Sequence, residues 1–272
     1  MASGGGSPIT PSCSPATRAD AVISLDHVSK SFANFNAVYD LSFRVHKGEI
    51  VTLLGRTGAG KTTVLNLIMG TTQPDSGSVR VVGIDPFRQF KALRGHMAVS
   101  FQTDRLLPWR TAVENAELGL LILGKSKREA REIATSWLAR VGLTGAEDKY
   151  IHELSGGMRQ RVSLARALAV DPQIVLLDES FSQLDHVTSS ALRRDFCALA
   201  RKFNKTCLMV THRIDDAIEM ADRVIVLGSQ ARIQFEAEID ARDDQSARES
   251  LRKRIEMALG GGPEEADHRE HA

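Results

Sequence analysis

The chain has 272 residues, of which 42% are hydrophobic and 25% are charged, and its formal net charge is +1. This is an ordinary globular composition, and the near-neutral charge argues against a nucleic-acid partner and against a polybasic membrane-binding surface. The cysteines Cys13, Cys197 and Cys207 share no metal-ligand spacing, and no run reaches the ~18 apolar residues of a membrane helix, so a zinc site, a disulfide scaffold and a membrane span are all disfavoured.

The sequence predicts an ordered region between two tails. Residues 1–20 and 259–272 are expected to be disordered, because such segments cannot offset their ordering entropy by burial. Short β-branched runs predict strands at residues 22–28, 41–45, 50–54, 79–82, 97–101, 174–177, 206–210 and 224–227. Apolar spacing predicts helices at residues 62–69, 127–141, 158–169, 187–202 and 214–220, and a charged helix near 243–257.

The order of these elements indicates the fold class. Strands that alternate with helices indicate an α/β fold around a mostly parallel sheet. The run 174–177 is apolar without alternation, which is typical of a strand buried on both faces. Residues from about 103 to 167 read almost wholly as helix, so we expect a helical insert in the α/β core.

A phosphate-binding motif, G-x-x-x-x-G-K-[ST], follows the strand that ends at Leu54 and precedes an apolar helix. Its glycines let backbone N–H groups turn toward phosphates, and the helix N-terminus adds a partial positive charge. The lysine reaches the β- and γ-phosphates, and the hydroxyl of the next residue ligates Mg²⁺. The predicted nucleotide-binding residues are Gly55, Arg56, Thr57, Gly58, Ala59, Gly60, Lys61, Thr62 and Thr63, with Thr62 as a metal ligand.

Two carboxylates, Asp178 and Glu179, follow the apolar run 174–177. Ligands in open α/β sheets bind at the carboxyl ends of the strands. We expect Asp178 to hold Mg²⁺, directly or through water, and Glu179 to polarise the attacking water as a general base. The alternative is a strand that runs out into a solvated acidic turn.

A second small-residue loop, LSGGM, precedes the helix at 158–169. It offers another anion-binding surface at a helix N-terminus. One chain seldom needs two phosphate sites for one nucleotide, which suggests that this loop serves the ATP of a neighbouring copy; a capped helix without special function is the alternative. The residues concerned are Ser155, Gly156 and Gly157.

With these motifs the sequence resembles the ATP-binding subunits of ABC transporters, over residues 21 to about 230. The resemblance implies an ABC ATPase domain over residues 21–258, with a P-loop NTPase (RecA-like) core, an N-terminal antiparallel β-subdomain and the helical insert. It also implies a head-to-tail dimer that holds two ATP molecules between the phosphate loop of one copy and the LSGGM loop of the other. This LSGGM loop, residues 154–158, is called the signature loop below. ATP closes such a dimer and hydrolysis opens it.

The resemblance assigns four more positions. Phe32 matches the aromatic residue that stacks on adenine, with Phe35 as its rival and an ordinary core phenylalanine as the alternative. Gln102 matches the glutamine that senses Mg²⁺ and water and links the site to the permease. Asp185 matches the aspartate of a loop that crosses the dimer interface, and His212 matches the histidine that contacts the γ-phosphate. The predicted catalytic residues are Glu179, His212 and Gln102, and the predicted metal ligands are Thr62, Gln102 and Asp178.

The segment FQ…LLPW…EN at 101–115 resembles the nitrate, sulfonate and taurine group of importer subunits, which includes bicarbonate relatives. This implies a separate transmembrane permease, an indirect solute-binding protein and a place at the cytoplasmic face of the cell membrane. Leu106, Leu107 and Trp109 are expected to form an apolar surface for the permease. The alternative is that Trp109 packs inside the helical insert.

Besides Thr57, a mild change from the usual serine of the phosphate loop, three residues depart from the pattern of this group: Ser180 stands where proline is usual, Gln183 where a small residue is common, and Arg213 where aspartate is frequent. All three are expected near the dimer interface.

Competing classes of protein fit the sequence less well. A GTPase would need Asn-Lys-x-Asp, whereas Asn204-Lys205 is followed by Thr206 and Cys207. A ribosomal or DNA-acting ABC ATPase would need a second unit or a long coiled coil, and an exporter is disfavoured by the segment after Gln102.

Overall fold

The computed structural model describes residues 21–33, 35–181, 186–239 and 244–260. The two expected tails therefore lie outside the described residues, apart from 259–260, which end a helix.

Strands of the described residues form two sheets, one antiparallel in the order β2-β1-β4 and one in the order β5-β6-β7-β3-β8-β9. In the larger sheet β5, β6, β7, β3 and β8 run parallel, and β9 pairs antiparallel with β8. The strands are β1 (Ala21–Phe32), β2 (Phe35–His46), β3 (Ile50–Gly55), β4 (Ser76–Val81), β5 (Met97–Ser100), β6 (Ile174–Asp178), β7 (Thr206–Thr211), β8 (Arg223–Leu227) and β9 (Ile233–Glu238).

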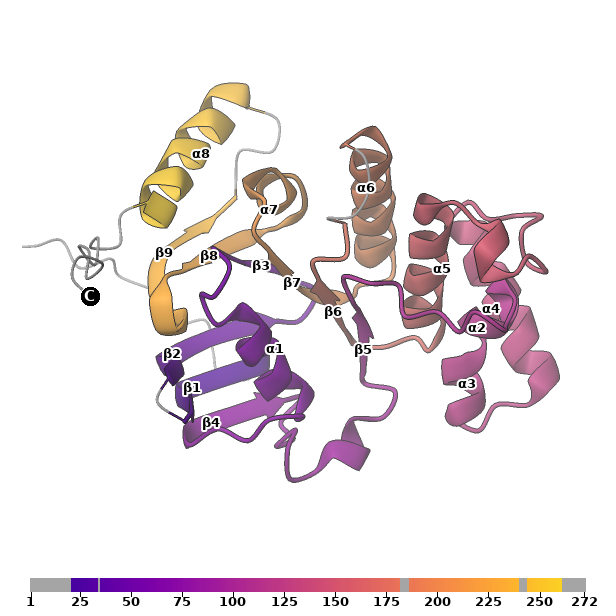
Figure 1. The fold of residues 1–272 in the computed structure, drawn as a ribbon, viewed down its shortest axis with the longest axis horizontal. Helices are drawn as coiled ribbons and strands as arrows, with labels where there is room; N and C mark the ends of the chain where they lie inside the picture. Colours follow the sequence, from indigo (N-terminus) through magenta and orange to yellow (C-terminus); the bar gives the residue numbers. More distant parts are fainter. Residues whose placement is uncertain (1–20, 34, 182–185, 240–243, 261–272) are drawn as a thin grey trace, which may run out of the picture.

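Helices surround the larger sheet (Figure 1). Helices α2 to α5 gather beyond its β5 edge, α7 packs on β3 and β7, and α8 lies beside β8 and β9. The α-helices are α1 (Lys61–Met69), α2 (Ala112–Ala116), α3 (Leu118–Ile122), α4 (Lys127–Arg140), α5 (Gly156–Ala169), α6 (His186–Lys202), α7 (Ile214–Met220) and α8 (Gln245–Gly260), and the 3₁₀ helices are η2 (Phe90–Leu93), η3 (Ile151–Glu153) and η4 (Ser229–Ala231).

Strand β6 is buried on both faces, as its sequence predicts. Val175 and Leu177 contribute to a core shared with the helices beyond the β5 edge. Ile174 and Leu176, on the opposite face, contribute to a core shared with α1 and the antiparallel sheet. Because side chains alternate between the faces of a strand, only a continuous apolar run fills both cores. The parallel core and the N-terminal antiparallel sheet are confirmed.

The structure contains the predicted helical insert as α2 to α5, but it differs from the sequence prediction in strand β9 and in the connections within the insert. Strand β9 was not predicted, because its residues IQFEAE are mostly exposed at the edge of the sheet and lack the apolar pattern of an inner strand. The expected helical insert contains two stretches without α-helix, 101–111 and 141–150, where turns and irregular chain connect the helices. Among the described residues, no helix combines the length and the apolar character needed to cross a membrane.

Candidate active site

The phosphate-binding loop lies between β3 and α1. Gly60, which caps α1, has φ 91°, a conformation that favours glycine, and a Cβ built there would lie 2.3 Å from the carbonyl oxygen of Ala37. The Lys61 ammonium is buried and donates to the carbonyl oxygens of Gly55 at 2.7 Å and Arg56 at 2.8 Å. Its Nζ is thus held against the first residues of the loop, which leads into the N-terminus of α1, and helix N-termini favour anions.

Three predicted catalytic residues meet at the carboxyl edge of the larger sheet. Gln102 follows β5, Glu179 follows β6 and His212 follows β7, and these strands are direct neighbours. The Gln102 amide Nε2 donates to Glu179 Oε2 at 3.2 Å, and His212 Nδ1 lies 3.1 Å from Glu179 Oε1. The sheet order therefore holds the Glu179 carboxylate between two polar side chains from distant parts of the sequence.

Asp178 and Lys61 carry opposite charges beside this cluster. Burial raises the pKa of the Asp178 carboxyl, and the nearby Glu179 raises it further, while Arg105 and Lys61 oppose the shift. Burial lowers the pKa of Lys61, and the carboxylates of Glu179 and Asp178 act against that shift. The bottom of the site is therefore partly desolvated, which strengthens the attraction of its charges for a charged ligand.

The residues present fit a magnesium ion that is shared with a nucleotide. Mg²⁺ is usually held by one or two carboxylates, water and substrate phosphates rather than by a full protein cage. The residues that would hold such an ion are Asp178, which lies close to Lys61, Gln102 with its side-chain oxygen, and the exposed Thr62 with a hydroxyl in the first turn of α1. Within the described ranges, no group of three or more His, Cys, Asp and Glu residues forms a metal cluster.

The signature loop lies apart from the phosphate-binding loop of the same chain. Ser155 caps α5 by accepting a hydrogen bond from the Met158 amide at 3.3 Å, and both Ser155 and Gly156 are exposed. Helix α5 lies beyond the β5 edge of the sheet, whereas α1 packs against its middle strands (Figure 1). The geometry thus leaves the loop open to another molecule.

The aromatic candidates for the adenine lie on the β1–β2 hairpin. Phe32 is 49% exposed and Phe35 is 56% exposed, so neither is a core phenylalanine. Lys30 Nζ lies 5.4 Å from the centroid of the Phe32 ring. The predicted interface residues Asp185 and Gln183 lie outside the described residues.

The expected permease surface is only partly present. Leu106 is 8% exposed and packs in the core of the helical insert, because the segment turns inward there, so its predicted place on the surface was wrong. Trp109 is 69% exposed, which rules out the alternative that it packs inside the insert. Leu107 is half-buried.

Two arginines of α5, which the sequence analysis missed, hold the segment after Gln102. Arg166 donates to the carbonyl oxygens of Asp104 at 2.7 Å and Arg105 at 2.8 Å, and Arg159 Nε lies 3.1 Å from the Asp104 carboxylate. The spacing of seven residues on one helix, which places both on one face, was the available signal. Helix α5 therefore connects the signature loop directly to the Gln102 segment.

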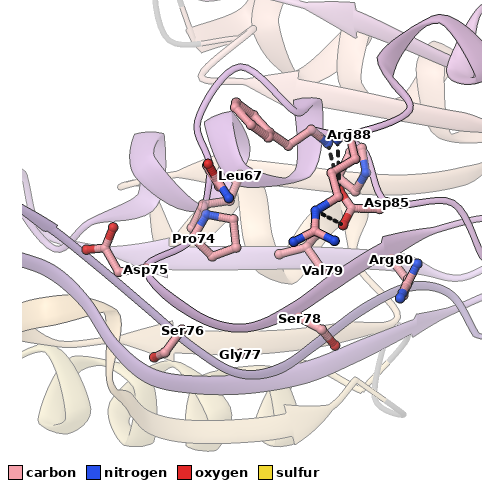
Figure 2. A pocket seen from close by; sticks show the side chains of 13 residues that line it. Leu67, Pro74, Asp75, Ser76, Gly77, Ser78, Val79, Arg80, Asp85 and Arg88 are labelled. Carbon is pink, nitrogen blue, oxygen red and sulfur yellow. Dashed lines mark hydrogen bonds and ion pairs between the residues drawn. The ribbon is translucent and has the colours of Figure 1, made fainter.

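A polar hollow of about 290 Å³ lies elsewhere, between β4 and the segment that follows it (Figure 2). Asp85 accepts hydrogen bonds there from the amides of Phe87 and Arg88, at 3.1 and 3.0 Å. None of the predicted site residues lines this hollow.

Comparison of the sequence with known proteins relates this chain to one protein family. The pattern of the family described as "ABC transporter" matches residues 38–182. The taurine import ATP-binding protein TauB of Yersinia pestis bv. Antiqua is 44% identical over 191 residues, which cover 70% of this chain and 73% of that protein. The nitrate import ATP-binding protein NrtC of Synechococcus elongatus is 38% identical over 227 residues, which cover 80% of this chain and 34% of that protein.

Solved structures show the same architecture. A dimeric post-hydrolysis state of the ATP-binding cassette MJ0796, bound to ADP and Pi, superposes with a TM-score of 0.70 at 30% sequence identity, and the match covers 80% of this chain and 98% of that one. The protein cbiO1 of Clostridium perfringens superposes with a TM-score of 0.76 at 21% identity over 89% of this chain and 97% of that one, which shows a shared fold.

Proposed function

Because the chain belongs to the ABC transporter family, we propose that it is the ATP-binding and ATP-hydrolysing subunit of an importer. It energises uptake of a small sulfonate or oxyanion, such as taurine or nitrate, through a separate permease at the cytoplasmic face of the cell membrane. The names and identities of the import relatives support the direction and the substrate class. The observation that carries the ATPase assignment is the Glu179 carboxylate held between Gln102 and His212 beside the phosphate-binding loop.

The residues divide the chemistry among them. When ATP binds, Lys61 Nζ donates to the β- and γ-phosphates in place of the carbonyl oxygens of its own loop. Thr62, Asp178 and Gln102 would hold Mg²⁺, which would neutralise phosphate charge when bound. Glu179 orients the attacking water and accepts its proton, while His212 donates toward the γ-phosphate and Gln102 fixes the Glu179 carboxylate. Phe32 or Phe35 stacks on the adenine.

A second copy completes each site. The dimeric cassette MJ0796 supports a dimer of this chain. The exposed signature loop of one copy, Ser155 to Gly157, would contact the ATP held by the phosphate-binding loop of the other. The exposed Trp109 and the half-buried Leu107, beside the segment that α5 holds, would contact the permease.

A mixed-dimer experiment tests the shared site. Lys61→Ala removes a charged phosphate ligand, and we expect ATP turnover to fall by about ten- to a hundredfold, the scale of a charge-assisted hydrogen bond. Ser155→Arg should be similarly inactive because it fills the signature loop. When the two variants are mixed, a heterodimer keeps one site with wild-type Lys61 and wild-type Ser155, so turnover should rise well above that of either variant alone. A mixture no more active than its components would contradict the shared site.

The transport assignment is tested by capturing partners from the host membrane. The chain with Glu179→Gln, which should retain ATP, is used as bait with Mg²⁺ and ATP, and the same bait without nucleotide is the control. We expect a multi-span permease and an extracytoplasmic solute-binding protein, whose ligand names the substrate. Capture of ribosomes or of a DNA-repair complex would leave the ATPase chemistry standing and remove the transport assignment.

A further inference from the structure

Ser180 makes a buried hydrogen bond between two strands of the larger sheet. It stands immediately after Glu179, is 3% exposed, and its Oγ donates to the carbonyl oxygen of Ser100 at 2.8 Å. Ser100 is the last residue of β5, two residues before Gln102. The bond therefore joins the two segments that carry the hydrogen-bonded side chains of Glu179 and Gln102.

The backbone explains why Ser180 faces β5. The ladder between β5 and β6 ends at the pair Ser100 and Leu177. Glu179 then adopts φ 46°, an uncommon left-handed conformation for a residue with a side chain. This turn directs the chain back across the sheet, so that the Ser180 hydroxyl continues the connection to β5 where the ladder has stopped.

Glu179 is consequently anchored on both sides. Its own amide donates to the carbonyl oxygen of Val210 in β7 at 2.9 Å, and the next residue donates to β5. The same two sides supply the partners of its carboxylate, His212 from β7 and Gln102 from β5. Both anchors are hydrogen bonds to carbonyl oxygens of neighbouring strands. The bond to β7 is donated by the backbone amide of Glu179, whereas the bond to β5, on the Gln102 side, is donated by the side chain of Ser180.

We propose that Ser180 is a positioning residue for hydrolysis, which holds the Gln102 segment against Glu179 through its bond to the Ser100 carbonyl. It acts through Gln102 and touches neither nucleotide nor water. This inference rests on the proposed ATPase function. Ser180 is buried, and it directly follows the catalytic carboxylate in the sequence.

Ser100 supplies a matched control for the substitution of Ser180. The bond uses the carbonyl oxygen of Ser100, and among the described residues the Ser100 hydroxyl has no hydrogen-bond partner. Ser100→Ala therefore deletes a buried hydroxyl at the same place and leaves the bond to Ser180 intact. Ser180→Ala deletes the bond with nearly the same loss of volume.

The test is a double-mutant cycle on ATP turnover by the full-length chain. We expect Ser180→Ala to lower kcat about fivefold, the scale of one net hydrogen bond, with the KM for ATP within about twofold. Ser100→Ala should remain within about twofold of wild type. In a Gln102→Ala background, Ser180→Ala should change kcat by less than about twofold, because the residue through which it acts is gone.

The outcomes separate this inference from the proposed function. Wild-type protein without ATPase activity would contradict the proposed function itself. An active wild type with an equal loss from Ser180→Ala in both backgrounds, or a loss in KM alone, would overturn only the role of Ser180. If Ser180→Ala fails to fold, Ser180→Cys keeps the side-chain volume with a weaker donor, and the same dependence on Gln102 is expected from it.

Discussion

Replacing Glu179 with glutamine is expected to lower ATP turnover by at least about 10²-fold while ATP binding is retained. Glutamine has the same shape, so it can still contact Gln102 and His212, which lie 3.2 and 3.1 Å from the carboxylate oxygens. It cannot accept a proton from water at neutral pH. Steady-state phosphate release measures the loss, and equilibrium binding of a labelled ATP measures what is retained.

Glu132→Gln is the matched control for this substitution. Glu132 is 65% exposed on α4, where it pairs only with Arg128 one turn away among the described residues. The same chemical change there should leave turnover within about twofold, because surface ion pairs contribute little. Turnover of the Glu179→Gln protein near that of wild type would remove Glu179 from the mechanism.

Replacing Arg193 with methionine is expected to lower the free energy of unfolding by about 3–5 kcal/mol. The Arg193 guanidinium is fully buried between α6 and α7 and lies 2.9 Å from the Asp216 carboxylate and 2.7 Å from that of Glu219. Methionine fills most of the volume but leaves the buried Asp216 without its main opposite charge. Urea denaturation of both proteins measures the difference.

The loss should depend on pH in a defined direction. Burial raises the pKa of Asp216 in the folded protein, and Arg193 opposes that shift, so the substitution raises the pKa further. An acid whose pKa is higher in the folded than in the unfolded protein binds its proton more tightly in the folded state. The stability from this tighter binding is fully present below the unfolded pKa, and it is lost as the pH rises through the folded pKa. The variant should therefore be closer to wild type at pH 5.5 than at pH 8.

Two further variants sharpen this prediction. Arg194→Met, on the next residue, alters a side chain that is 66% exposed, and it should cost less than about 0.5 kcal/mol. Adding Asp216→Asn to Arg193→Met removes the stranded charge and should recover much of the stability. Equal losses from the two arginine variants, or a loss unchanged between the two pH values, would contradict the buried pair.

Local motifs made much of this molecule predictable. The phosphate-binding motif fixes a strand, a loop and a helix at once, and the run 174–177 predicts a strand with two buried faces. Glu179 was predicted from its place after a buried strand, and Gln102 and His212 were predicted from the family pattern. The three lie together because their strands are neighbours in a parallel sheet. Their roles in catalysis remain predictions.

Long-range side-chain contacts were not predictable from one sequence. Nothing in the local pattern indicates that Arg193 is buried, because arginine on an amphipathic helix usually faces solvent. Leu106 and Trp109 are close in sequence and similar in polarity, yet one is 8% and the other 69% exposed, which depends on how the segment packs on α5. Strand β9 is stabilised by pairing with β8 and has no strong strand signal of its own.

The position of β3 in the larger sheet has a consequence for biosynthesis. All six residues of β3 are buried, and its two neighbours are β7 and β8. At roughly 5–20 residues per second, the ribosome needs on the order of 10–30 s to make the roughly 150 residues between β3 and β7. During that time the most apolar strand near the N-terminus has two unpaired edges, which are sites of aggregation. The yield of folded protein should therefore depend on the rate of translation and on chaperones that shield this segment before β7 and β8 emerge.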